Sequence, residues 1–118
     1  MVTKKEILMA AIANLIIEQG ASFSSSVTVK DANGNPYNLT GYTASAKMAL
    51  GYSSTRTRTV ITTTINSPET GVIVLSLTAD QTSNLEAPAR YVYDIDITAS
   101  DSTVTRVIEG IITTRPNV

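Results

Sequence analysis

The chain has 118 residues and a formal net charge of −1, and 42% of its residues are apolar but only 5% aromatic. This length predicts one domain, and with no Trp its core must be built mostly from Ile, Val, Leu and Ala. The chain has no His, which is the commonest general base, and no Cys, so it can form neither disulfides nor thiolate-bound metal sites. The absence of Cys also means that the sequence does not indicate whether the protein works in an oxidising or a reducing compartment. Its scattered Lys and Arg residues give no electrostatic footprint for nucleic acid. Such a thin core favours self-association or incorporation into an assembly.

The N-terminal residues carry an ambiguous pattern. Lys4 and Lys5 precede an apolar run over residues 7–17, which superficially resembles a signal peptide. Glu6 interrupts the basic part and Asn14 interrupts the apolar part, so the pattern departs from a signal peptide. The run is also too short and too interrupted to cross a bilayer.

Two secondary structures are consistent with this segment. Thr3 and Glu6 have the spacing of a capping box, which predicts a short helix. The apolar residues at helical spacing are Ile7, Leu8, Ala11, Ile12, Leu15 and Ile16. The alternative is a first strand over residues 14–18 that ends before Gly20. In either case we expect residues 1–13 to form a docking arm, with Ile7, Leu8, Met9 and Ile12 as its candidate interface residues.

From Phe23 onward, apolar and polar residues alternate with period two, which is typical of half-buried strands. The strands expected from this pattern span residues 23–30, 42–50, 59–65, 72–78, 91–97 and 103–114. Turn-forming residues separate them at 31–36, 67–71 and 99–102, a polar loop covers 51–57, and a short helical crossover covers 79–85.

These short strands at regular spacing predict an all-β fold over residues 14–118, an immunoglobulin-like antiparallel β-sandwich with a short N-terminal arm. The alternation also predicts which side chains point into the core. These are Val27, Val29, Ala46, Leu75, Leu77, Tyr93, Ile95 and Ile97.

Residues 31–42 contain a pattern that partly resembles a calcium loop. Asp31, Asn33 and Asn35 alternate as calcium ligands do. Gly34 lies at the wrong position for such a loop, and Tyr42 occupies the place of the bidentate Glu. We therefore expect a turn here and no metal site.

Asp94 and Asp96 are the one pair of carboxylates that suggests catalysis. Residues two apart on a strand face the same direction, but the sequence provides no identifiable partner acid, base or metal ligand. We expect a solvated strand face, or a pair matched by Arg106 across the final hairpin.

Two further patterns have plain structural interpretations. Arg56, Arg58 and Lys47 suggest a basic edge, which we interpret as an edge strand that resists self-pairing. Asn38-Leu39-Thr40 has the form of a glycosylation sequon, which we attribute to chance because no convincing secretory signal precedes it. The sequence thus identifies no catalytic, cofactor-binding or metal-binding residue.

Several segments together resemble a known family. The most specific are Glu18-Gln19-Gly20, Leu39-Thr40-Gly41-Tyr42, Tyr91-Val92-Tyr93-Asp94 and residues 106–110. They are similar to the N-terminal β-sandwich domain of baseplate upper proteins of tailed bacteriophages, and to related stand-alone virion proteins of marine phages and cyanophages. The resemblance covers residues 15–118. The family usually has a glycine just before its Tyr-x-Tyr-Asp strand, where this chain has Pro88-Ala89-Arg90.

The resemblance implies a non-enzymatic structural protein of the virion that needs no cofactor. Its leading role is a docking module of the tail, baseplate or neck region that connects a fibre or appendage to the particle, and the alternative is a capsid decoration protein. Its partners would be other phage virion proteins and further copies of itself, with no nucleic acid or membrane, and it would be assembled in the host bacterial cytoplasm. A carbohydrate-binding module is less consistent with the sequence, because its aromatic platform would need Tyr residues alone.

Overall fold

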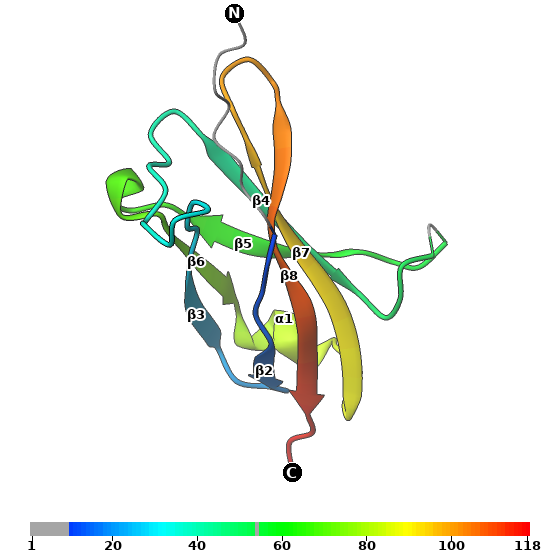
Figure 1. Ribbon diagram of the computed structural model, residues 1–118. Coiled ribbons are helices and arrows are strands. Elements are labelled where there is room, and N and C mark those ends of the chain that lie inside the picture. Colours follow the sequence, from blue (N-terminus) through cyan, green and yellow to red (C-terminus); the bar gives the residue numbers. More distant parts are fainter. Residues whose placement is uncertain (1–9, 54) are drawn as a thin grey trace, which may run out of the picture.

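The computed structural model describes residues 10–53 and 55–118, which form an almost entirely β structure with one short α-helix (Figure 1). The strands are β1 (Ala11–Ile12), β2 (Leu15–Glu18), β3 (Phe23–Thr28), β4 (Thr43–Ala49), β5 (Thr59–Thr64), β6 (Val72–Leu77), β7 (Ala89–Thr98) and β8 (Val104–Arg115). A 3₁₀ turn, η1 (Pro68–Thr70), precedes β6, and the helix α1 (Ala79–Ser83) follows it. Within the described ranges, no helix is long and apolar enough to cross a membrane.

The strands are hydrogen-bonded in the order β1-β8-β7-β4-β5-β6-β3, and β2 also pairs with β8. Strand β5 joins two parts of this sheet, because residues 59–61 pair with β4 and residues 62–64 pair with β6. The sheet therefore curls around the core, with the β4–β7–β8 sheet on one side and the β3–β6 sheet on the other (Figure 1).

The all-β expectation is confirmed, but the expectation of purely antiparallel pairing is wrong. Strands β1 and β2 run parallel to β8, with Ala11 opposite Ile108 and Leu15 opposite Ile112. Parallel pairing at this edge is compatible with a long connection, because the two partners lie at opposite ends of the chain. The strand interpretation of residues 14–18 is confirmed, whereas the helical interpretation is wrong for the residues of β1 and β2.

The predicted inward-facing side chains are all buried in one core. Val27 is the most exposed of them, at 8% of its surface, and Leu75, Ile95 and Ile97 are completely buried. The centre of this core also contains Ile17, Leu39, Met48, Ile61, Ile73, Ile108 and Ile112. Alternation along β6 and β7 places Leu75, Leu77, Tyr93, Ile95 and Ile97 on the side of the curled sheet that faces this core.

A buried threonine connects the helix to the start of β3. Thr82 is fully buried, and its Oγ1 accepts a hydrogen bond from Gly20 N at 3.0 Å. The same hydroxyl donates toward the carbonyl oxygens of Ala21 and Ala79. Gly20 adopts a φ of +84°, a conformation that residues with a Cβ rarely adopt. Part of the Glu18-Gln19-Gly20 motif is therefore explained by the turn that it forms.

Candidate functional site

The exposed apolar side chains of the N-terminal strand form the candidate site. Ile12 is 75% exposed and lies in β1 beside Glu109. Ile16 is 58% exposed and lies in β2 beside Thr113. Of the four predicted interface residues, Ile12 is thus accessible, and Ile7, Leu8 and Met9 lie outside the described residues.

Ile111 on β8 completes this cluster. It is 40% exposed and lies midway between the residues that face Ile12 and Ile16. We call Ile12, Ile16 and Ile111 the isoleucine patch. Neighbouring strands are separated by about 5 Å, so these three side chains are close enough to be covered by one partner surface.

The sequence analysis missed Ile16 and Ile111, although the sequence contains a signal for both. Each is followed by another isoleucine, and successive side chains on a strand point to opposite faces. Ile17 and Ile112 are completely buried. The first isoleucine of each pair must therefore point away from the core.

Residues 13 and 14, which separate β1 from β2, hold this edge of the sheet against β8. Ala13 N donates to Glu109 O at 2.9 Å, and the Asn14 side-chain oxygen accepts from Ile111 N at 3.0 Å. The chain passes so close to Gly110 that a Cβ there would lie 2.1 Å from Ala13 O. Gly110 is thus required by close packing of two backbones, which accounts for the last residue of the 106–110 motif.

Tyr93 holds Ala13 from the core side. Its hydroxyl donates to Ala13 O at 2.6 Å, and its side chain is 3% exposed. Burial raises the pKa of Tyr93 to about 12. The phenol therefore remains a hydrogen-bond donor at neutral pH.

The outer side of the β7–β8 hairpin carries an ion-pair cluster centred on Arg106. The guanidinium lies 3.2 Å from Asp94, 3.9 Å from Asp96 and 3.8 Å from Glu109. The predicted match of Arg106 with the two aspartates is confirmed. Burial, followed by the charge of Asp94, raises the pKa of Asp96, and these effects exceed the opposing influence of Arg106 and Lys47. The aspartates are engaged in a partly solvated surface network.

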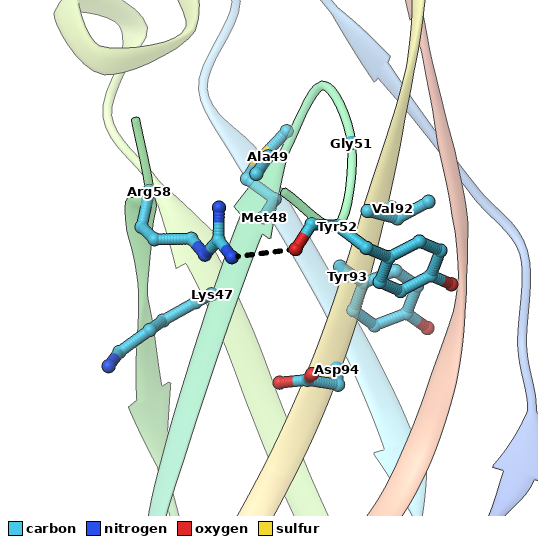
Figure 2. A pocket seen from close by; sticks show the side chains of 9 residues that line it. All are labelled: Lys47, Met48, Ala49, Gly51, Tyr52, Arg58, Val92, Tyr93 and Asp94. Carbon is cyan, nitrogen blue, oxygen red and sulfur yellow. Dashed lines mark hydrogen bonds between the residues drawn. The ribbon is translucent and has the colours of Figure 1, made fainter. Parts of the chain in front are cut away.

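A shallow hollow lies on the same outer side, where the loop after β4 turns back over the sheet (Figure 2). Figure 2 shows the Tyr52 ring beside Val92, and Arg58 donating to the Tyr52 carbonyl oxygen at 3.3 Å. The hollow has a volume of about 50 Å³, which is room for one or two water molecules. It is too small for an organic ligand, since ligand pockets start at about 300 Å³.

A larger cavity of about 410 Å³ lies between the loop that precedes β5 and the turn that precedes β7. Its polar lining consists of Arg56, Glu86 and Tyr91 together with Asn84 and three threonines. The Tyr91 hydroxyl accepts a hydrogen bond from Glu86 N at 2.8 Å. Neither Asp94 nor Asp96 lines this cavity, so the carboxylate pair and the cavity do not form one site.

The remaining candidates have structural roles. Asp31 Oδ1 accepts from the backbone N–H groups of Asn33 and Asn35, at 2.9 and 3.0 Å, as in the predicted turn. The edge-strand interpretation of the basic residues is wrong. Lys47 lies in β4, which is paired on both sides, and Arg58 binds three carbonyl oxygens of its own loop.

The tyrosines do not gather into one flat platform. Tyr91 and Tyr93 are buried, as predicted. Tyr37 and Tyr42 meet edge to face at 5.8 Å, with their hydroxyl oxygens 2.8 Å apart. Tyr52 is 75% exposed and lies in a different loop. A bound carbohydrate would therefore have to stack on tyrosine rings that do not share one flat surface.

No protein-family model matches the chain, and no curated protein sequence matches it. Among solved structures, it is similar to part of an internalin-like protein from Listeria monocytogenes, with 17% identity and a TM-score of 0.42 over 92% of this chain and 28% of the other. It is also similar to part of a family 123 glycoside hydrolase from Clostridium perfringens, with 12% identity and a TM-score of 0.39 over 92% of this chain and 23% of the other. The chain thus spans about a quarter of the length of each.

Proposed function

We propose that this chain is a non-enzymatic structural protein of a tailed-bacteriophage virion, in which it acts as a docking module. Its place would be the tail, baseplate or neck, where it connects a fibre or appendage to the particle. The observation that carries this proposal is the isoleucine patch, because three exposed isoleucines on adjoining strands favour a protein partner over water.

The motif residues that carry the family resemblance have structural roles in this fold. Gly20 forms a turn with positive φ, and Gly110 permits the close approach of the Ala13 backbone. The Tyr93 hydroxyl donates to Ala13 O, between β1 and β2. These residues would be needed in any protein that shares the fold, whatever its partner. The partner-specific contacts are therefore expected elsewhere, on the exposed side chains.

We also infer that the fold is an immunoglobulin-like sandwich. Two observations support this inference. Strand β5 passes from the β4–β7–β8 sheet to the β3–β6 sheet, so two sheets enclose one core. The core between these sheets is formed by the alternating inward residues of both, as in such sandwiches.

The proposal is tested on particles purified from a host infected with the phage whose genome encodes this chain. Mass spectrometry and immunogold labelling are expected to find the chain at several copies per particle, at the tail, baseplate or neck. Labelling of the head would instead support the capsid decoration alternative. Absence of the chain from purified particles would overturn the virion assignment.

A further inference from the structure

The edge of the sheet formed by β3 is open. Strand β3 pairs with β6 over its full length of six residues, from Phe23 opposite Leu77 to Thr28 opposite Val72, with no bulge. It ends the strand order, and it pairs with no other strand in residues 10–53 and 55–118 (Figure 1). A regular unpaired strand edge is a template for another strand.

The hydrogen-bonding pattern identifies the free backbone groups. Val29 N donates to Gly71 O at 2.8 Å, so the backbone N–H of Val29 points toward β6, and the N–H and C=O groups of every second residue before it point the same way. Ser25 and Val27 therefore bond to β6. The N–H and C=O groups of Ser24, Ser26 and Thr28 point away from β6, toward solvent.

The features that normally block an open edge are missing from this strand. Strand β3 contains no charged residue and no proline, and neither do β5 and β6. The other edge of the molecule is different, because β1 and β2 are separated by the break at Asn14 and Glu18 at the end of β2 pairs with Arg115 at 3.2 Å. The β3 edge is thus the one that can accept a partner strand without like-charge repulsion.

We propose that β3 of a second copy of this chain pairs with β3 in antiparallel orientation across a twofold axis. With the axis at Ser26, the free groups of Ser24 would face those of Thr28 in the other copy, and Ser26 would face itself. This register forms about six backbone hydrogen bonds. The two β3–β6 sheets would then form one continuous sheet.

A second copy of β3 fits this edge because its polar and apolar side chains alternate between the two faces of the sheet in the same way. On the outer side, the pairs would join Ser24 to Thr28 and Ser26 to Ser26, which are all short and exposed. On the core side, Phe23 is only half-buried and Val29 is 2% exposed, and the proposed register places them opposite each other. An unrelated strand would need this alternation by coincidence, whereas a second copy has it by symmetry.

The chain contains no cysteine, so one introduced cysteine can form a disulfide only with another copy. At the twofold axis, the two Ser26 Cα atoms would be about 5.5 Å apart. This separation lies within the range of about 4.4–6.8 Å that a disulfide spans. The two Ser24 Cα atoms would be about 14 Å apart, since four residues separate them along the strand.

The test is oxidation of the full chain carrying Ser26→Cys, with Ser24→Cys as the matched control. Both positions are exposed serines on the same face of the same strand. We expect Ser26→Cys to form covalent dimers at least about tenfold faster, a ratio that corresponds to about 1.4 kcal/mol. Equal rates would indicate random collision and would overturn the proposal.

Sedimentation of the unmodified chain gives an independent test. We expect a concentration-dependent dimer that Ser26→Lys abolishes, because two like charges would meet at the axis. The control, Ser45→Lys at an exposed position of the central strand β4, should leave the dimer intact. A chain that stays monomeric up to about 1 mM would overturn the proposal, and so would a dimer that survives Ser26→Lys but is lost when residues 1–9 are deleted. These measurements use the purified chain, so they are independent of whether it belongs to a virion.

Discussion

The two edges of the curled sheet are built on different principles. At one edge, β1 and β2 are fixed by backbone packing at Gly110, the Tyr93 hydroxyl and the Asn14 side chain. At the other edge, β3 is regular, uncharged and open. The first edge exposes apolar side chains, whereas the second exposes backbone groups. The two edges of this small domain therefore differ in chemistry, and each of the two proposed interfaces rests on one of them.

The core between the two edges should be the most sensitive region. Ile95 on β7 is completely buried, so Ile95→Ala should lower the free energy of unfolding by about 2–5 kcal/mol through the cavity that it leaves. Asp96→Ala, one residue along and on the outer face, should cost less than about 1 kcal/mol. Urea denaturation measures both, and equal losses would show that the faces of β7 are wrongly assigned.

The fixed edge should tolerate little change at Gly110. A Cβ at this position would lie 2.1 Å from Ala13 O, so Gly110→Ala should cost about 1–3 kcal/mol of unfolding free energy as the backbones separate. Tyr93→Phe, which removes the bond to the same oxygen, should cost about 1 kcal/mol.

The double variant sharpens this test. Once Gly110→Ala has displaced Ala13, the Tyr93 bond is already lost, so the two costs should not add. Additive costs would mean that the two residues act separately. Tyr93→Phe should also remove the phenol whose pKa is raised to about 12, which an ultraviolet titration above pH 10 can detect.

Proline substitutions at neighbouring residues of β3 should differ in their effect on the free energy of unfolding. Ser25→Pro removes an N–H that bonds to β6, and it should cost about 1–3 kcal/mol of unfolding free energy. Ser26→Pro removes an N–H that faces solvent in a single copy, so its cost should be smaller when measured in dilute solution. A larger loss for Ser26→Pro than for Ser25→Pro would reverse the assignment of the free backbone groups.

The smallest expected effect concerns the charged outer face. The pKa of Asp96 is raised in the folded state above its ordinary value of 3.8, so ionisation of Asp96 disfavours folding. This penalty is absent well below pH 3.8 and complete above the folded-state pKa. Asp96→Asn should therefore be at least as stable as the unchanged protein at pH 7, and this difference should vanish as the pH falls. A variant that is clearly less stable at pH 7 would show that the Arg106 contact dominates instead.

The sequence predicted much of this fold because the strands follow a local rule. Period-two alternation correctly identified the inward residues of β7, from Tyr93 to Ile97, and the turn residues correctly separated most strands. The match of Arg106 to Asp94 followed from the hairpin, whose register is fixed by a short turn.

The parallel pairing of β1 and β2 with β8 could not be predicted in this way. Its partners are far apart in the sequence, and local alternation carries no information on direction or partner. The close approach of Ala13 to Gly110 depends on this pairing, so it was missed as well. The candidate site was predicted only at Ile12, because Ile16 was assigned to the β-domain over residues 14–118 and Ile111 to a hairpin strand, in both cases without regard to the outward face.

The central claim is that the isoleucine patch binds another protein of the particle, and its most direct test is incorporation of a patch variant. Phage carrying Ile12→Ser with Ile16→Ser would be compared with phage carrying Val104→Ser, an exposed apolar residue at 60% exposure near the tip of the β7–β8 hairpin. We expect the double variant to melt at the same temperature as the unchanged protein but to be depleted at least about tenfold from purified particles. The Val104 variant should be incorporated normally. Normal incorporation of the double variant would contradict the claim.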